Sequence, residues 1–351
     1  MKGYLEKRIK KVAILVLLVG LILCEACKND FSVNADYEDF PIIYGLLDAA
    51  DSIHYVKVFK SFLVPYDANQ ATKDLHLYSY IDSVETYLEE YDANNQYIRR
   101  IDLDTTTAVP KDSGLFSYPL QIVYQTNATI KTDYKYKLCV FNPYTRKIAE
   151  STTNMGLTEA ARLSKPLGNE VSITDRTFSI EFYTGKRNYG CYAVLYFYYS
   201  EQYKDNTVQS MSPVRISLGE YTDPNQTAAQ KVAINSDGKY FFEMLAKNIK
   251  DDNNVKARRV DSLEIALYSV GADFMYYRLA NTPTSSINQQ RMEYTNFKAK
   301  NIDTEENKFV LGVISSRASS SVKYSNLHYN GSRDSLFNGR FTKHLKFTNV
   351  F

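Results

Sequence analysis

Side chains able to perform acid–base or metal chemistry are few in this sequence. They are four histidines and two adjacent glutamate pairs: His54, His76, His328, His344, Glu89–Glu90 and Glu305–Glu306. No two histidines flank a glutamate at the spacing of a zinc-binding helix, and the sequence has no phosphate loop, dinucleotide fingerprint or Gly-x-Ser-x-Gly elbow. Adjacent carboxylates on strands or loops are more typical of a solvated surface. We therefore expect no enzymatic activity, no metal and no cofactor, although a triad assembled only in space stays open.

Tyrosine is the one residue type whose abundance suggests binding. The chain has 30 tyrosines and 18 phenylalanines but no tryptophan. A tyrosine offers a flat apolar face with a polar tip, which suits sugar rings and protein interfaces. The candidate ligand or partner contacts are Tyr196, Tyr198, Tyr199, Tyr276 and Tyr277. The alternative is that these rings fill the faces of β-sheets.

The first residues are typical of an export signal. Four basic residues lie between positions 7 and 11, and a short apolar run covers 12–23. Such a run is too short for a membrane-spanning helix, which needs about 20 residues. The segment ending at Cys27 resembles the lipobox of bacterial lipoproteins, in which the cysteine after the cleavage site is acylated. Ala26 is small, whereas Leu23 before Cys24 is bulky, so we assign the anchor to Cys27 and a signal peptide to residues 1–26.

The charge balance argues against nucleic acid as a partner. The full chain has a net charge of +2, and removal of residues 1–26 takes away five basic and two acidic residues, which leaves about −1. Acyl chains on Cys27 would hold the protein on a membrane without spanning it. Only Cys139 and Cys191 then remain, in apolar strand-like runs, and we expect buried free thiols.

The pattern along the chain predicts a mainly β protein with two domains. Residues 27–40 are polar and are expected to form a flexible tether. Residues 41–155 contain seven strand signals, at 41–47, 53–63, 83–91, 97–103, 119–125, 134–141 and 146–152. That count predicts an immunoglobulin or fibronectin III-like sandwich. Residues 132–138 resemble the penultimate strand of fibronectin III modules, in which a tyrosine braces a tight corner.

Residues 165–351 are predicted to form a second β-rich domain with one or two short helices. Strands are expected at 177–183, 190–203, 213–221, 230–235, 260–270 and 309–315, and helices at 239–250 and 272–280. A serine-rich loop is expected at 315–321. The final segment, 341–347, alternates like a strand. The sequence shows no internal repeat.

A short pattern resembles the O-glycosylation site of exported Bacteroidota proteins. It consists of Asp, then Ser or Thr, then an apolar residue or Thr. The acceptor residues of its five occurrences are Ser52, Ser83, Thr105, Ser262 and Ser335. These are candidate modification sites and not active residues.

The signal, the Cys-Lys-Asn-Asp start and the tyrosine-rich β chain together resemble Bacteroidota outer-membrane lipoproteins of uncharacterised function. The segments that carry the likeness are 43–47 with 53–58, 260–265 leading to Tyr276–Tyr277, and 309–313. Genes of this kind often lie beside TonB-dependent transporters. The resemblance implies an accessory of nutrient uptake on the surface or facing the periplasm, with a TonB-dependent outer-membrane barrel as its partner.

Three functions are compatible with these observations. The first, which we favour, is a lipid-anchored accessory that binds a transporter or its cargo. The second is an adhesin or fimbria-related subunit that polymerises by strand exchange, for which segment 341–347 could serve as the donor. The third is a hydrolase whose site the sequence does not reveal.

Overall fold

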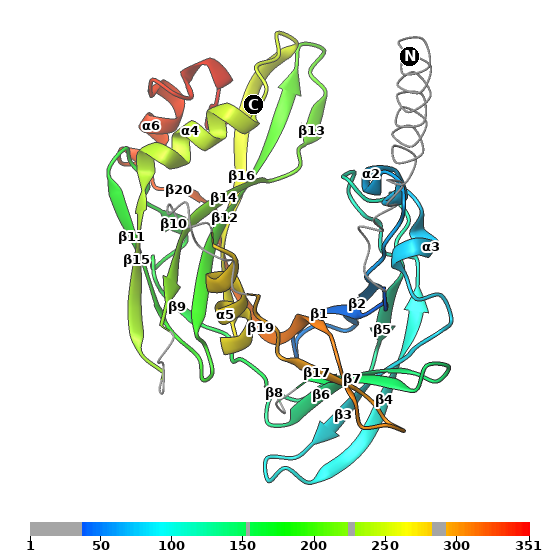
Figure 1. Ribbon diagram of the computed structural model, residues 1–351. Helices are drawn as coiled ribbons and strands as arrows, with labels where there is room; N and C mark the ends of the chain where they lie inside the picture. Colours follow the sequence, from blue (N-terminus) through cyan, green and yellow to red (C-terminus); the bar gives the residue numbers. More distant parts are fainter. Residues whose placement is uncertain (1–36, 152–154, 224–228, 283–292) are drawn as a thin grey trace, which may run out of the picture. The chain divides into compact units, whose positions relative to one another are not determined.

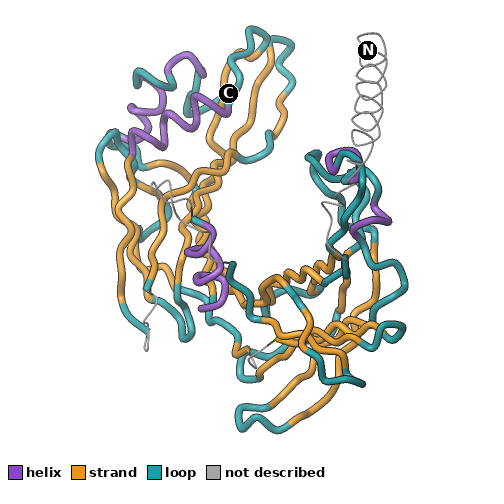
Figure 2. The backbone as a smooth tube through the Cα atoms, in the orientation of Figure 1, coloured by secondary structure: helices purple, strands orange, loops and turns teal. Residues whose placement is uncertain are grey.

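The computed structural model describes residues 37–151, 155–223, 229–282 and 293–351. Contacts separate residues 1–38 from one unit formed by residues 39–351, and the account below concerns that unit. Strands are its predominant secondary structure (Figure 1), and Figure 2 shows that helices are few and short. The expectation of a mainly β protein is confirmed. Within the described residues, no helix is both long and apolar enough to cross a membrane.

The first seven strands overlap the predicted segments, although β5 begins four residues later than the predicted strand at 119–125. They are β1 (Pro41–Leu47), β2 (His54–Lys60), β3 (Glu85–Tyr91), β4 (Tyr97–Thr106), β5 (Val123–Thr126), β6 (Lys135–Asn142) and β7 (Lys147–Ser151). The strands β1, β2 and β5 pair antiparallel in that order, and β4, β3, β6 and β7 form a second antiparallel series. Two short helices, α2 (Ala68–Ala71) and α3 (Leu75–Tyr78), lie between β2 and β3 and were not predicted.

The second half of the chain contains the longer strands. They are β8 (Met155–Gly156), β9 (Arg162–Lys165), β10 (Glu170–Val171), β11 (Thr177–Tyr183), β12 (Gly190–Tyr203), β13 (Val208–Ser210), β14 (Val214–Thr222), β15 (Lys231–Asp237), β16 (Val255–Val270), β17 (Phe297–Asn301), β18 (Asn307–Lys308), β19 (Leu311–Tyr324) and β20 (Asn326–Leu327). The helical segments are α4 (Gly238–Asn248), α5 (Ala272–Asn281), α6 (Ser332–Asn338) and the 3-10 turn η1 (Lys343–Leu345). Both helices predicted from the sequence are confirmed. Asp237 caps α4 by accepting a hydrogen bond from the Lys239 amide at 2.9 Å.

The two halves repeat one pairing order that the sequence does not reveal. In the second half, β9, β11 and β15 pair as a three-stranded sheet, with β11 in the middle. The strands β14, β12, β16 and β19 pair in that order. If each set is numbered one to seven, leaving out the short β8, β10 and β13, both sets contain the pairings 1-2-5 and 4-3-6-7. In the first set β4 also pairs with β5, which joins its two series. For brevity we use the names first sandwich for the strand set β1–β7 and second sandwich for the strand set β9, β11, β12, β14, β15, β16 and β19.

Strand β19 belongs to both sandwiches. Its first residues pair parallel with β1, from Leu311 opposite Ile42 to Ser316 opposite Leu47. Its later residues pair antiparallel with β16, from Arg317 to Tyr324. Gly312 has a positive φ of 125°, and a Cβ there would lie 1.9 Å from the carbonyl oxygen of Ile43, so no larger residue fits this crossing. Together with the pairing of β4 and β5, these pairings join most strands into one mixed 15-stranded sheet.

Each sandwich has its own hydrophobic core. The first is formed by side chains such as Val56, Leu88 and Leu138, and it also takes Phe297 and Ile314 from the second half of the chain. Strand β17 extends the first sandwich by pairing with β7. The second core lies beneath β12 and β16 and is covered by α4 and α6, which lie close together in Figure 1.

Two local expectations were wrong. The serine-rich stretch 315–321 is part of β19 and not a loop, because buried hydroxyls of Ser315 and Ser316 bond the Phe274 and Thr158 amides at 3.2 and 2.9 Å. Segment 341–347 is not a strand. It contains η1, and the buried Arg258 guanidinium donates to the Leu345 carbonyl at 2.8 Å, which holds the backbone in a turn.

Candidate functional site

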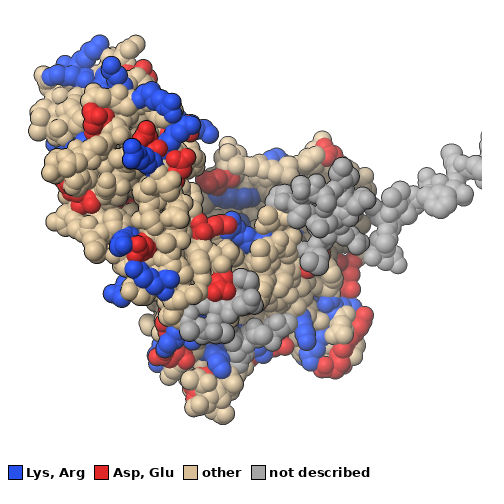
Figure 3. Space-filling view, turned by 90° about the vertical axis from the view of Figure 1, so that its left-hand side faces the viewer, with Lys and Arg blue, Asp and Glu red and all other residues tan. Residues whose placement is uncertain are grey.

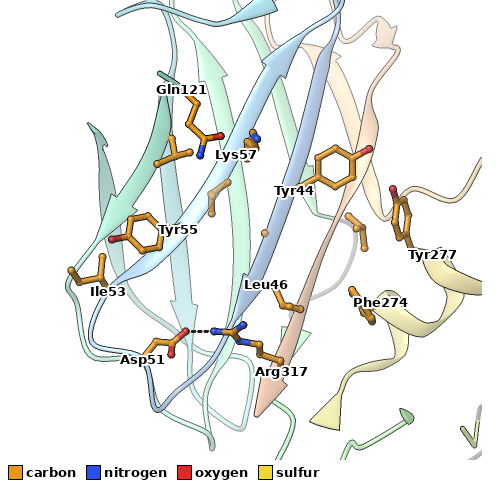
Figure 4. Close-up of a pocket in the computed structure, with 14 residues that line it drawn as sticks. Tyr44, Leu46, Asp51, Ile53, Tyr55, Lys57, Gln121, Phe274, Tyr277 and Arg317 are labelled. Atoms are coloured by element: carbon orange, nitrogen blue, oxygen red, sulfur yellow. Dashed lines mark hydrogen bonds and ion pairs between the residues drawn. The ribbon is translucent and has the colours of Figure 1, made fainter. Parts of the chain in front are cut away.

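A groove of about 400 Å³ lies on the outer face of the sheet β1–β2–β5 (Figure 4). The strand alternation that buries Val56 and Val58 turns Tyr55 and Lys57 outward into it. Helix α5 contributes Phe274 and Tyr277. The remaining lining residues are Tyr44, Gly45, Leu46, Asp51, Ile53, Val56, Gln121, Val123, Val313 and Arg317. The lining is thus mostly apolar and aromatic, with few polar groups.

Two polar side chains in the groove, Gln121 and Lys57, lack a hydrogen-bond or ion-pair partner among the described residues for one of their groups. Gln121 is 8% exposed; its amide nitrogen donates to the carbonyls of Val109 and Pro110 at 3.2 and 3.4 Å, while its Oε1 accepts no hydrogen bond from any described residue. Lys57 is half-buried and forms no ion pair with a described carboxylate; its ammonium lies 4.8 Å from the Phe59 ring centroid. Burial and the nearby Lys111 lower the pKa of Lys57. Figure 4 shows Gln121 and Lys57 at one end of the groove. A buried acceptor and a desolvated cation are costly unless a ligand satisfies them.

The opposite wall is aromatic. The rings of Tyr44 and Tyr277 meet edge to face with centroids 5.9 Å apart. Burial, together with the Tyr277 hydroxyl, raises the pKa of Tyr44 to about 12, so Tyr44 is neutral at physiological pH. Tyr55 is exposed across the groove. These rings offer flat apolar faces with hydroxyl tips.

The far end of the groove carries an ionic cluster. Arg317 donates to Asp51 at 2.9 Å and lies 3.5 Å from the buried carboxylate of Asp48. Burial lowers the pKa of the neighbouring His54 and raises that of Asp48. Because Arg317 already has two carboxylate partners, the free cationic end of the groove is at Lys57.

The five tyrosines predicted as contacts lie in four different settings. Tyr277 lines the groove. Tyr276, on the same helix, packs against Tyr294 with centroids 6.0 Å apart. Tyr196 and Tyr198 lie on the outer face of β12, where their hydroxyls contact Tyr268 at 2.8 Å and Glu264 at 3.1 Å. Tyr199 is buried in the second core.

The candidate glycosylation residues also differ in setting. Ser52 and Thr105 are exposed. Ser83 and Ser262 are half-buried, and Ser262 lies within β16 opposite Tyr198. Ser335 is half-buried inside α6. Of the five, Ser52 lies closest to the groove, between the lining residues Asp51 and Ile53.

The remaining predicted residues are the cysteines. Cys27 and Cys24 lie outside the described residues. Cys139 and Cys191 are buried free thiols, as predicted, and burial raises the pKa of each to about 12. In the described part of the chain, no three His, Cys, Asp or Glu side chains cluster closely enough to hold a metal ion. Figure 3 shows positive and negative side chains interspersed on the face it presents.

The groove residues Lys57, Gln121 and Tyr44 were not singled out from the sequence. A period-two strand places Lys57 on the outer face of β2, but only the fold brings this face against α5, more than 200 residues away in the chain. The one available signal was the predicted helix at 272–280 with its paired tyrosines.

No family model and no curated protein matches the chain. Distant structural matches exist. The C-terminal globular domain of an oligosaccharyltransferase from Pyrococcus abyssi is 10% identical, with a TM-score of 0.23 over 64% of this chain and 43% of that one. The fibronectin(III)-like modules of Clostridium thermocellum CbhA are 12% identical, with a TM-score of 0.18 over 82% and 94%. Trypsin-activated alpha-2-macroglobulin from Escherichia coli is 9% identical, with a TM-score of 0.15 over 84% and 24%.

Proposed function

We propose that this protein is a non-enzymatic binding protein, anchored to the outer membrane through Cys27, whose ligand site is the groove between β1–β2–β5 and α5. One observation carries the choice of site: a Gln121 with a buried, unpartnered acceptor and a Lys57 without an ion pair to a described carboxylate line the same mostly apolar groove. Ligand sites are typically concave and apolar with a few such polar groups.

The lining defines the chemistry of the ligand. An apolar body would lie between Tyr55 and Tyr277, an anionic group would pair with Lys57, and a hydroxyl or amide N–H would donate to Gln121 Oε1. The ligand class is therefore an amphipathic molecule or peptide segment with one acidic group. Because the pKa of Lys57 is lowered, the affinity should fall as the pH rises toward that pKa.

The anionic dye 1-anilinonaphthalene-8-sulfonate, which has an apolar ring system and one sulfonate, is a direct probe of this groove. Lys57→Gln should weaken its binding by about tenfold, the worth of one charge-assisted contact. Lys60→Gln, on the same strand but outside the lining, is the matched control. Equal affinities in both variants would show that the groove is not the site.

We infer that both sandwiches are fibronectin III-like. The shared 1-2-5 and 4-3-6-7 pairing supports this. A tyrosine corner supports it for the first sandwich, since the buried Tyr136 hydroxyl accepts a hydrogen bond from the Lys131 amide at 2.7 Å, five residues upstream.

The anchor, the location and the partner rest on the resemblance of residues 1–30 and of the strand segments to outer-membrane lipoproteins. A TonB-dependent barrel would then be the partner, with the protein on the cell surface or facing the periplasm. A gentle-detergent pull-down of the tagged, membrane-extracted protein tests this. A stoichiometric barrel supports the proposal, whereas self-association alone points to the adhesin alternative.

The adhesin alternative loses the donor strand that segment 341–347 was expected to supply. That segment contains η1, and the Arg258 amide and carbonyl bond Lys346 and Thr348 at 3.0 and 2.8 Å. Strand exchange through the tail would require this closed contact to open.

A further inference from the structure

An exposed apolar surface lies at one end of the first sandwich, and its members are not among the residues that line the groove. Its members belong to the β2–β3 and β4–β5 connections and are between 37 and 60% exposed: Leu63, Tyr66, Leu115, Phe116, Tyr118 and Leu120. We call them the end surface. Single exposed apolar residues are ordinary, but four of these six fall within residues 115–120 alone, and such a concentration is typical of an interaction site.

The two segments are held together as one structure. The Ser117 amide donates to the Thr72 carbonyl at 2.9 Å, and the Thr72 hydroxyl donates to the Leu115 carbonyl at 2.9 Å. The Phe116 ring packs edge to face on Tyr78, with centroids 5.0 Å apart. The end surface is therefore a built feature with an ordered backbone beneath it.

The register of the sheet places this surface where the chain enters the fold. Strand β1 begins at Pro41, which pairs with Lys60 at the end of β2. Next to this pair, the Phe40 amide donates to the Ser61 hydroxyl, and the Ser61 amide donates to the Phe40 carbonyl. Strand β5 runs antiparallel to β2 and begins at this same end. The start of the first strand and both connections therefore share one end of the sandwich.

Only 13 residues separate Cys27 from Pro41. Even a fully extended tether of that length spans at most about 50 Å. If Cys27 is acylated, the end of the first sandwich at Pro41 lies within about 50 Å of the bilayer, and the end surface is at that end.

The side chains of the end surface suit a lipid–water interface. Leucine and phenylalanine can enter the acyl boundary, and tyrosine places its ring at the headgroups. Two lysines lie among them: Lys73 donates to the Leu115 carbonyl at 2.5 Å, and the Lys111 ammonium lies 5.0 Å from the Phe116 ring centroid. Neither forms an ion pair with a described carboxylate, and lysines at an interface extend toward the headgroups.

We propose that the end surface docks on the membrane to which Cys27 anchors the chain, so that the sandwich is oriented by two contacts instead of hanging from a tether. This inference rests on the proposed lipid anchor. The acyl chains would hold the chain on the membrane, and the end surface would fix how the first sandwich is oriented on it.

The test uses the full protein, extracted from membranes and reconstituted into phosphatidylethanolamine and phosphatidylglycerol vesicles that contain a photoactivatable phospholipid. Peptide mapping should find the label concentrated in residues 61–66 and 111–121. The triple substitution Leu115→Ser, Tyr118→Ser, Leu120→Ser should lower that labelling by about tenfold or more. The matched control is Tyr97→Ser, Leu167→Ser, Val208→Ser, which removes similarly or more exposed apolar groups elsewhere and should change nothing.

Labelling that avoids the two segments, or that is equal in both triple variants, overturns the inference. So does a concentration-dependent dimer that the first triple abolishes, because the surface would then join two copies. An unchanged melting temperature and unchanged protection of Cys139 show that the first triple is folded.

Mass spectrometry of the N-terminus separates the two proposals. An acylated Cys27 with an unlabelled end surface refutes the docking and keeps the anchor. An unmodified Cys27 with a labelled end surface refutes the anchor, and with it the proposal of two contacts, although the end surface itself then binds lipid.

Discussion

In both sandwiches a buried glutamate on the third strand needs a hydrogen-bonding partner on the sixth strand, and the two sandwiches supply different partners. In the first, Glu90 on the third strand lies opposite Tyr136 on the sixth; in the second, Glu201 on the third strand lies opposite Arg258 on the sixth. The Tyr136 hydroxyl contacts Glu90 at 2.9 Å, and the Arg258 guanidinium contacts Glu201 at 2.8 Å. All four side chains are buried.

The difference follows from what each connection offers before the sixth strand. In the first sandwich, a short loop presents the Lys131 amide, so the partner must accept a hydrogen bond, and a tyrosine hydroxyl does. In the second, the connection contains α4 and ends by presenting the Lys250 carbonyl, while the tail presents that of Leu345. A guanidinium donates to both carbonyls and to Glu201 at once. The sixth-strand residue opposite the glutamate is therefore a tyrosine where the neighbouring loop presents an amide, and an arginine where the neighbouring backbone presents carbonyls.

The largest effect is expected from Arg258→Met. It leaves the buried Glu201 carboxylate and two carbonyls without their donor, and should lower the free energy of unfolding by about 3–5 kcal/mol. Chemical denaturation measures this. The double variant with Glu201→Leu should recover part of the loss, and no recovery would contradict the pairing.

A smaller effect is expected from Tyr136→Phe. The Lys131 amide loses its acceptor, but Glu90 keeps Arg99, which donates to it at 2.6 Å. The loss should be about 1–3 kcal/mol by denaturation. An equal loss of unfolding free energy in Tyr136→Phe and Arg258→Met would contradict the comparison, because both hydrogen-bond networks would then contribute equally to stability.

The two buried cysteines report on the sandwiches separately. Cys139 lies in β6 and Cys191 in β12, and neither thiol can react with an alkylating reagent until its surroundings open. Arg258→Met should speed alkylation of Cys191 more than that of Cys139, and Tyr136→Phe should do the reverse. Equal acceleration at both would show that the sandwiches open together through β19.

The smallest effect concerns alkaline pH. Burial and the Glu90 carboxylate raise the pKa of Tyr136 in the folded protein, so its contribution is complete below pH 10 and is lost as the pH rises toward the folded value. The destabilisation caused by Tyr136→Phe should therefore be about 1 kcal/mol smaller at pH 11 than at pH 8. Arg258→Met should show no such change, since a guanidinium does not titrate in this range.

Sequence patterns located most strands and both predicted helices because their signals are local. Period-two alternation at Tyr136, Leu138 and Val140 gave β6, and the spacing of Phe242 and Leu245 gave α4. The serine-rich part of β19 has no such local signal, because its buried hydroxyls are satisfied by distant backbone groups. Segment 341–347 has the alternation of a strand without being one, because Arg258 occupies its backbone carbonyl at Leu345.

The candidate site was the least predictable part. Its tyrosine wall includes Tyr277, which composition suggested, but Lys57 and Gln121 are unremarkable in the sequence. We propose them as ligand contacts because, in the folded chain, Gln121 Oε1 accepts no hydrogen bond and Lys57 forms no ion pair with a described residue. Whether a side chain has such a partner depends on its neighbours in space, which the sequence does not give.

By itself the sequence determined the class of strand-rich protein, the buried thiols and the period of each strand, because hydrophobic periodicity acts within a few residues. The tertiary structure alone decided that the two halves share one topology, that β19 serves both sandwiches, and that α5 closes a groove over β1 and β2. These features depend on pairings between residues hundreds of positions apart, and such pairings leave no periodic trace in either segment.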